Sequence, residues 1–233
     1  MVVVVTGASK GIGRALAEKF ASAGATLVIC ARSAQQLVQT ATQLTAKYPQ
    51  SKVYTMAADL ANKAEAEAFG KFVLENAGRV DVLVNNAGSF LPGSVKAEED
   101  GVLEKMISTN LYSAYHLTRA LLPVMVKAHA GHIFNMCSIA SLQAYSNGGS
   151  YSISKFALAG FSKNLREELK QHNIKVTAVY PGAVYTDSWS GSGVDPNRIM
   201  EAADVAELVF TVSQLSPQAC VEELVLRPQL GDL

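Results

Sequence analysis

The sequence lacks most of the features that mark secreted, metal-binding or nucleic-acid-binding proteins. Among 233 residues there are three cysteines, Cys30, Cys137 and Cys220, which stand far apart in apolar, strand-like contexts. We therefore expect buried thiols rather than a disulfide framework or a zinc site. The 20 basic and 20 acidic side chains cancel, which leaves no net field for nucleic acid or an anionic membrane. Any partner must be recognised by a local site.

Long apolar runs are also missing. The opening run Met1–Val5 is too short for a signal sequence or a membrane span, and Ala120–Val126 is interrupted by Pro123. His129 and His132 have no cysteine or acidic residue nearby, so we expect no metal ion. These features predict a cytoplasmic protein that neither spans a membrane nor binds nucleic acid.

What the sequence does contain is a regular alternation of short β-branched runs and longer segments of helical periodicity. Such repeated βαβ units build a parallel sheet with helices on both faces. The expected strands are Val2–Val5, Thr26–Cys30, Lys52–Met56, Val80–Val84, His132–Cys137, Lys175–Tyr180 and Val221–Leu226. The expected helices are Ile12–Ala23, Ala34–Lys47, Lys63–Asn76, Asp100–Lys127, Tyr151–His172 and Ala202–Leu215. This pattern predicts one α/β domain over residues 1–233, a doubly wound Rossmann-type three-layer sandwich with a seven-stranded parallel sheet.

A glycine-rich loop joins the first predicted strand to the first predicted helix. It reads Thr6-Gly7-Ala8-Ser9-Lys10-Gly11-Ile12-Gly13, a Gly-x3-Gly-x-Gly spacing that differs from the common G-x-G-x-x-G pattern. Glycines in this context let the backbone approach a pyrophosphate at the start of a helix, although they can also form a simple tight turn. The loop is a candidate dinucleotide site.

The end of the second predicted strand bears on the choice of dinucleotide. An NAD-binding unit places a carboxylate there to accept hydrogen bonds from the adenosine ribose, whereas this chain has Arg32. A guanidinium suits a 2′-phosphate, and Lys10 in the glycine loop can reach the same group. Both residues could instead be ordinary surface cations. The pattern favours NADP(H) over NAD(H).

A tyrosine and a lysine open one of the later predicted helices. Tyr151 and Lys155 are four residues apart and therefore share a helix face, where the ammonium and an oxidised nicotinamide would both stabilise a phenolate. Such a pair alone is often only surface packing. Ser138 follows a strand at the sheet edge where ligands bind, and Asn110 is a poor helix former inside a long predicted helix. Together these residues are candidates for proton transfer.

In this order along the chain, the motifs resemble the classical short-chain dehydrogenase/reductase family. The matching elements are the glycine loop, Asp59-Leu60, Asn85-Asn86-Ala87-Gly88, Asn110, Ser138, Tyr151-x3-Lys155, and Pro181-Gly182 followed by Thr186. The ordered set covers nearly the whole chain.

The resemblance implies an NADP(H)-dependent oxidoreductase that moves a hydride between the nicotinamide and a carbonyl or alcohol. Tyr151 would be the general acid and base, and Ser138 would bind the reacting oxygen. Lys155 would hold the nicotinamide ribose and lower the tyrosine pKa. Asn110 would support a water-linked proton path to Lys155. Asp59 would meet the adenine, Asn86 the adenosine-side ribose region and Thr186 the nicotinamide amide. The implied cofactor contacts are Gly7, Ser9, Lys10, Gly11, Ile12, Gly13, Arg32, Asp59, Leu60, Asn86, Ala87, Gly88, Tyr151, Lys155, Pro181, Gly182, Val184 and Thr186.

The substrate stays open at this point. The expected pocket residues are Ser89, Phe90, Ile139, Gln143, Tyr145, 183–185 and Trp189, with a short substrate lid around 187–197. A 3-oxoacyl thioester, a sugar or polyol, a steroid-like ketone and a small ketone or aldehyde are all compatible with the reaction.

Two other functions fit the sequence less well than a reductase. A cofactor-sensing regulator would be expected to lack Ser138, Tyr151 or Lys155, and an isomerase or epimerase would be expected to have a longer chain. Apolar positions in the helices predicted over Asp100–Lys127 and Tyr151–His172 exceed what one sheet face needs, and together with the resemblance they predict a homotetramer or a homodimer.

Overall fold

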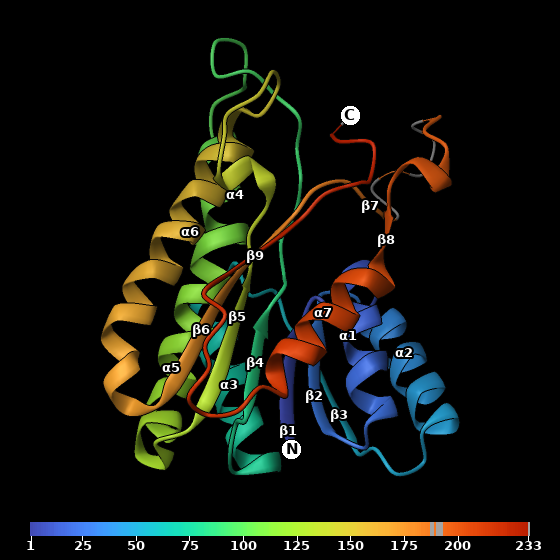
Figure 1. The fold of residues 1–233 in the computed structure, drawn as a ribbon, viewed down its shortest axis with the longest axis vertical. Coiled ribbons are helices and arrows are strands. Elements are labelled where there is room, and N and C mark those ends of the chain that lie inside the picture. Colours follow the sequence, from blue (N-terminus) through green and yellow to red (C-terminus); the bar gives the residue numbers. More distant parts are fainter. Residues whose placement is uncertain (187–188, 190–192, 233) are drawn as a thin grey trace.

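The computed structural model describes residues 1–186, 189 and 193–232, and its centre is a parallel sheet (Figure 1). The seven strands run in the order β3-β2-β1-β4-β5-β6-β9, and each neighbouring pair is parallel. They are β1 Val2–Thr6, β2 Thr26–Ala31, β3 Val53–Ala57, β4 Val82–Asn85, β5 Gly131–Met136, β6 Ile174–Pro181 and β9 Glu223–Leu226. The predicted seven-stranded parallel sheet is confirmed.

Helices cover both faces of the sheet, as Figure 1 shows. Alternate residues of β1 point to opposite faces, so that Val3 and Val5 join one buried cluster and Val2 and Val4 join the other. The first cluster is completed by α1 Gly11–Ser22, α2 Ala34–Lys47 and α7 Ala202–Ser213. The second is completed by α3 Lys63–Ala77, α5 Ser113–Ala128 and α6 Gly149–Leu169. The three-layer Rossmann-type sandwich is therefore confirmed.

The structure divides the single helix predicted over Asp100–Lys127. A short α4, Val102–Ile107, is followed by a π-helical turn, η1 Ser108–Tyr112, and then by α5. Asn110 lies in the π turn and is 1 % exposed, so its amide must find hydrogen-bond partners inside the protein. The prediction of one unbroken helix is wrong because apolar periodicity does not reveal the wider turn that directs this buried amide.

Two short strands above the sheet had no counterpart in the sequence prediction. β7 Val184–Tyr185 pairs in parallel with β8 Met200–Glu201, and the 3₁₀ turn η5 Pro196–Arg198 precedes β8. Further 3₁₀ turns are η2 Ile139–Ser141 and η3 Lys170–His172. None of the helices in the described residues is long and apolar enough to cross a membrane.

The predicted burial of the cysteines holds for two of the three. Cys30, in β2, and Cys137, directly after β5, are buried. Cys220 is half-buried, and its Sγ lies 3.7 Å from the carbonyl oxygen of Val176.

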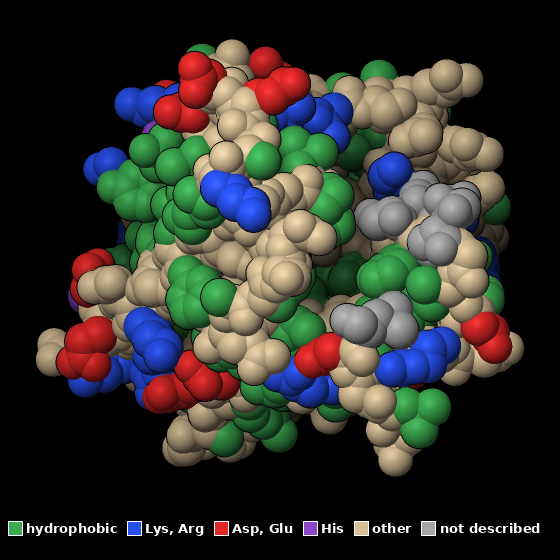
Figure 2. Space-filling model, turned by 90° about the horizontal axis from the view of Figure 1, so that it is seen from above, with side chains coloured by type: hydrophobic (Ala, Val, Ile, Leu, Met, Phe, Trp, Pro, Cys, Tyr) green, Lys and Arg blue, Asp and Glu red, His purple; other side chains and the backbone are tan. Residues whose placement is uncertain are grey.

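The carboxyl ends of the strands meet at one end of the molecule. Here the strand order reverses between β1 and β4, which in open α/β sheets is the place where ligands bind. Figure 2 views the molecule from this end, and the surface is hollowed near its centre, with hydrophobic side chains in the hollow.

Candidate active site

The glycine loop connects β1 to α1 in a compact turn. Gly7 and Gly11 have φ angles of +65° and +55°, in the left-handed region that favours glycine. At Gly13 a Cβ atom would lie 2.3 Å from the carbonyl oxygen of Gly7, so that only glycine fits there without movement. The loop therefore needs all three glycines for its own geometry.

Asn86, which follows β4, fixes this loop from the side. Its Nδ2 donates to the carbonyl oxygens of Thr6 (2.8 Å) and Gly7 (3.3 Å). In the other direction, the Thr6 hydroxyl oxygen accepts from the backbone N–H of Asn86 and of Ala87. The amide of Asn86 thus holds the glycine loop against the end of β4, in addition to bordering the cavity described next.

A cavity of about 370 Å³ opens beside the loop, a size typical of small-molecule sites. It brings together most of the predicted cofactor contacts: Gly7, Ser9, Lys10, Gly11, Ile12, Gly13, Arg32, Asp59, Leu60, Asn86, Ala87, Gly88 and Thr186. Residues that sequence reasoning did not assign also line it: Cys30, Ala31, Ser33, Gln36, Ala58, Ala61, Thr109 and Ser113. Several of these directly adjoin predicted residues in the chain, which is the signal that could have found them.

The residues of this cavity fit a phosphorylated dinucleotide. Arg32 directly follows β2, where a ribose-binding carboxylate would otherwise be, and Lys10 of the glycine loop lines the same cavity. Ser33 caps α2, its Oγ accepting from the backbone N–H of Gln36 at 3.4 Å. Two cations, a hydroxyl and a helix N-terminus among the lining residues suit a phosphate group.

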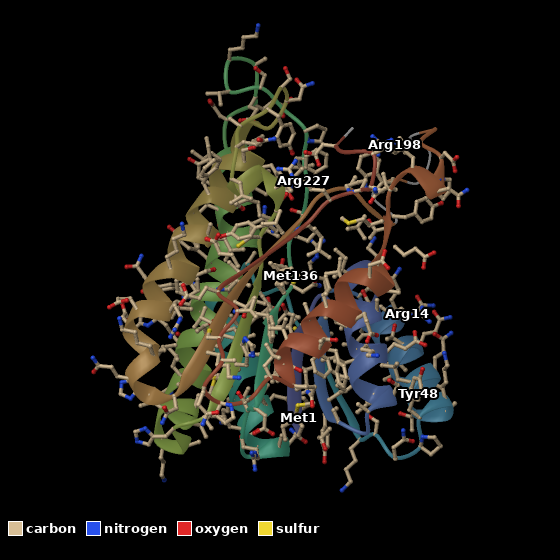
Figure 3. All side chains as sticks on the ribbon, viewed as in Figure 1. Met1, Arg14, Tyr48, Met136, Arg198 and Arg227 are labelled. Atoms are coloured by element: carbon tan, nitrogen blue, oxygen red, sulfur yellow. The ribbon has the colours of Figure 1, made fainter. Side chains whose placement is uncertain are left out.

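The proton-transfer candidates lie on α6 and on the loop after β5. Lys155 is 5 % exposed, and its Nζ donates to the carbonyl oxygen of Met136 at 2.7 Å. Met136, labelled in Figure 3, lies near the middle of the molecule at the end of β5. The Nζ is 5.8 Å from the ring centroid of Tyr151. Ser138 is also buried, and its hydroxyl interacts with the Tyr151 phenol.

Burial dominates the protonation of these groups. It raises the pKa of Tyr151 to about 12, against the smaller lowering effect of the Ser138 hydroxyl. It also lowers the pKa of Lys155 to about 8, a change that the nearby Cys137 thiol opposes. In the chain by itself the pKa of Tyr151 is raised, because loss of hydration outweighs the hydrogen bond with Ser138, and the lowering by Lys155 that the family resemblance implies stays a prediction. The phenol is fully protonated at neutral pH.

Asn110 reaches the same region from the π turn. Its Oδ1 accepts from the backbone N–H of Ser89 at 2.8 Å, and its Nδ2 donates to the Ser89 carbonyl at 3.0 Å and to the Ser154 hydroxyl at 2.9 Å. A Cβ at Gly88 would lie 3.0 Å from Asn110 Oδ1 and 3.6 Å from Lys155 Nζ. Asn110 and Lys155 therefore border the same glycine, and the water-linked path between them stays a prediction.

Other predicted contacts lie apart from the cavity. Pro181 ends β6, and Val184 is in β7. The N–H of Gly182 donates to the carbonyl of Leu226 at 2.8 Å, and a Cβ there would lie 3.2 Å from Asp232 Oδ1. The C-terminal tail holds this region. Its carbonyls at 230–232 accept from Arg198 of η5, and within the tail Arg227 pairs with Asp232; both arginines are labelled in Figure 3.

The predicted lid is described only in part. Residues 187–188 and 190–192 lie outside the described residues. The backbone N–H of Trp189 donates to the Thr186 carbonyl at 2.9 Å. Of the other predicted pocket residues, Phe90 packs edge-on against the Tyr151 ring, with 4.8 Å between centroids. Phe90 and Tyr145 are both exposed, and Tyr145 is close enough to Tyr151 to raise its pKa.

Sequence reasoning missed a row of buried polar side chains beneath the site. Asn85 Nδ2 donates to Asn135 Oδ1 at 2.8 Å and to Thr118 Oγ1 at 2.9 Å, and Asn135 Nδ2 donates to Ser162 Oγ at 2.9 Å. The row joins β4, β5, α5 and α6. Asparagines at matching places in two neighbouring strands were the available signal.

Comparison with known proteins agrees with this geometry. Residues 1–196 match the family model described as short chain dehydrogenase. The chain is 32 % identical over 240 residues to the sepiapterin reductase of Chlorobaculum tepidum, covering 100 % of this chain and 98 % of the relative. It is similar to the alcohol dehydrogenase of Thermococcus sibiricus complexed with 5-hydroxy-NADP, with 30 % identity, a TM-score of 0.90, and coverage of 98 % of this chain and 96 % of that chain. It is also similar to L-sorbose reductase from Gluconobacter frateurii complexed with NADPH and L-sorbose, with 29 % identity, a TM-score of 0.89, and coverage of 97 % and 94 %. The chain therefore belongs to the short-chain dehydrogenase/reductase family of oxidoreductases, in its classical form.

Proposed function

We propose that this protein is an NADP(H)-dependent oxidoreductase that transfers a hydride between the nicotinamide and a carbonyl or alcohol, with Tyr151 as general acid and base. The observation that carries the proposal is the convergence of Tyr151, buried Lys155 and buried Ser138 at the carboxyl edge of the sheet that also carries the glycine loop. Burying an amine beside a phenol costs stability, and such arrangements are concentrated at active sites.

NADP(H) is the proposed cofactor because two cationic side chains line the cavity. Arg32 and Lys10 would pair with the 2′-phosphate, with Ser33 and Gln36 beside them. The backbone of the glycine loop would hold the pyrophosphate at the N-terminus of α1. Two of the similar structures are described as complexes with 5-hydroxy-NADP and with NADPH. When bound, the cofactor would supply or accept the hydride.

The chain's own residues would then manage the proton. Tyr151, with a pKa of about 12, is protonated at neutral pH and can donate to the carbonyl oxygen as it gains charge. Ser138 would hydrogen-bond the same oxygen and orient it. Lys155, charged below a pH of about 8, would hold the ribose and stabilise the phenolate left after donation. In the oxidative direction the same groups would act in reverse.

We further propose a small ketone or aldehyde, or a 3-oxoacyl thioester, as the substrate class. Phe90 and Tyr145 give the space beside Tyr151 an aromatic side that suits the apolar part of such a molecule. One domain over residues 1–233 would supply both the cofactor site and the chemistry, with the short segment 187–197 closing over the substrate.

The test is a screen of NADPH oxidation by the purified protein. The panel would contain ketones, aldehydes and 3-oxoacyl thioesters, together with sepiapterin and L-sorbose, which are chosen from the names of two relatives. We expect turnover with at least one class and a preference for NADPH over NADH. If no carbonyl consumes NADPH, and no alcohol reduces NADP in the reverse assay, the proposed reaction is wrong.

We also propose that the protein assembles as a homotetramer or homodimer through the outer faces of η1, α5 and α6. Tyr112, Tyr115, Ile153 and Phe156 on these elements are between 37 % and 46 % exposed, so that large side chains with apolar surface lie open to a partner. A second copy of the same helices would bury them.

A further inference from the structure

The start of α6 is capped from a distant part of the chain. Gly148 occupies the N-cap position and has no side chain with which to bind the free N–H groups of the first turn. Glu98, from the segment between β4 and α4, supplies the missing acceptor. Its Oε1 accepts from the backbone N–H of Ser150 at 2.9 Å, and its Oε2 accepts from the Ser150 hydroxyl at 2.5 Å.

The capping carboxylate is itself held in place. The backbone N–H groups of Ala97 and Glu98 both donate to the Ser94 carbonyl, at 2.7 and 2.9 Å, which closes a tight turn around Glu98. A second bond ties this segment to the loop before α6, since the Gly93 N–H donates to the Asn147 carbonyl at 3.0 Å. The segment therefore meets the first turn of α6 at more than one point.

Gly149 has the shape that this contact requires. Its φ is +38°, and a Cβ there would lie 2.1 Å from Glu98 Oε1 and 2.7 Å from the Gly93 carbonyl oxygen. Any side chain at this position would displace the carboxylate. We call this contact the Glu98 cap. It consists of the two hydrogen bonds from Ser150 to the Glu98 carboxylate and the close approach of Glu98 Oε1 and the Gly93 carbonyl to Gly149.

Tyr151 directly follows Ser150, the residue that Glu98 holds. Phe90, from the same β4–α4 segment, packs on the Tyr151 ring with centroids 4.8 Å apart. The segment thus packs against the ring of Tyr151 and also holds Ser150, the residue directly before it. Neither contact involves the cofactor cavity, which lies against the glycine loop.

We propose that Glu98 is a positioning residue that fixes the first turn of α6 and thereby holds the Tyr151 hydroxyl in line with Ser138 for proton transfer. This inference rests on the proposed function for its catalytic consequence. Without the cap the first turn would open more often, and the phenol would spend less time in its reactive position. Small displacements of a catalytic group lower turnover strongly, by up to about 100-fold for roughly 1 Å.

The test compares five full-length proteins: wild type, Glu98→Ala, Glu98→Gln, Gly149→Ala and the matched control Glu99→Ala, which removes a neighbouring exposed carboxylate. Glutamine keeps one oxygen to accept from the Ser150 N–H and an amide that can donate to its hydroxyl. Two measurements are made on each protein, steady-state reduction with NADPH and hydrogen exchange of the peptide that spans 149–155.

For Glu98→Ala we expect kcat to fall by roughly 10- to 100-fold with the KM for NADPH changed by less than about 3-fold. Exchange in the first turn of α6 should become about tenfold faster, which is the usual effect of losing a helix cap. Glu98→Gln should stay within about 3-fold of wild type in both measurements, and Glu99→Ala should match wild type. Gly149→Ala, which displaces the carboxylate sterically, should resemble Glu98→Ala.

Two results would overturn the proposal. The first is a Glu98→Ala protein with wild-type kcat and wild-type exchange. The second is a Glu98→Ala protein in which kcat and the KM for NADPH deteriorate together while exchange rises across the whole chain, since that describes general unfolding. If wild type itself has no turnover, the proposed function fails. The hydrogen exchange then still tests the Glu98 cap, because unchanged exchange at 149–155 in Glu98→Ala would show that Glu98 does not fix the first turn of α6.

Discussion

A single methyl group at Gly13 should disrupt both the fold and the cofactor site. In Gly13→Ala the new Cβ would lie 2.3 Å from the Gly7 carbonyl oxygen and 2.4 Å from Asn86 Nδ2. These separations are roughly 1 Å shorter than van der Waals contact. The overlap cannot be relieved by rotating a flexible side chain, because Asn86 Nδ2 is bound to the carbonyls of Thr6 and Gly7.

The expected change in the free energy of unfolding of Gly13→Ala is the sum of two destabilising effects and one stabilising effect. Overpacking of this kind destabilises a protein by about 1–3 kcal/mol, and a lost Asn86 hydrogen bond adds about 1 kcal/mol. Replacing glycine by alanine in a helix recovers about 0.5–1 kcal/mol. We therefore expect Gly13→Ala to lower the free energy of unfolding by roughly 1–3 kcal/mol. The dissociation constant for NADPH should rise by at least about tenfold, because the Gly7 carbonyl belongs to the phosphate-binding loop.

Gly160 offers a matched control. It is an exposed residue in α6, and apart from its two chain neighbours and the backbone of its own helix, a Cβ there would meet no heavy atom of the described residues within 4 Å. Gly160→Ala should raise the free energy of unfolding by about 0.5–1 kcal/mol and leave NADPH binding unchanged. Urea unfolding without cofactor, followed by fluorescence titration with NADPH, measures both quantities. A Gly13→Ala protein as stable as Gly160→Ala would refute the account of the loop.

Three further predictions follow from the same structure. Arg32→Ala should weaken NADPH binding by about 10- to 100-fold and NADH binding by less than about 3-fold, and equal losses would remove the 2′-phosphate assignment. Because Lys155 has a pKa of about 8 and loses its charge above it while Tyr151 stays protonated, kcat/KM for NADPH should decline as pH rises from 7 to 9.5 in the free enzyme; a flat profile would contradict this order of titration. Sedimentation at micromolar concentration should show a dimer or tetramer, and a Phe156→Asp variant should shift it toward monomer; wild type sedimenting only as monomer would exclude the proposed assembly.

The layered fold was predictable because its signals are local. Every residue of β1 is nine-tenths or more buried, and a continuous run such as Val2–Val5 in this position suits only a strand covered on both faces. The break in the helix at Asn110 was not predictable in form. The sequence indicates an unfavourable residue, but its partners, Ser89 and Ser154, are known only once two other segments are placed beside it.

In the candidate active site, too, local motifs were predictable from the sequence and contacts between distant segments were not. The glycine loop and the Tyr151–Lys155 spacing could be identified from short motifs. Two contacts between distant segments could not be identified in this way. They are the hydrogen bond from Lys155 to the Met136 carbonyl and the edge-to-face packing of the Phe90 and Tyr151 rings. The raised pKa of Tyr151 was also not predictable from the sequence, because its main cause is burial, and burial is a property of the folded chain.

The most direct test of the proposed reaction removes one oxygen atom. Tyr151→Phe deletes the proton donor while keeping the ring that packs against Phe90, so the fold and the cofactor cavity should be unchanged. With a carbonyl that wild type reduces, we expect kcat to fall by at least about 100-fold while the dissociation constant for NADPH, measured by fluorescence titration, stays within about 3-fold. A Tyr151→Phe protein that turns over at the wild-type rate would contradict the assignment of this residue as the general acid.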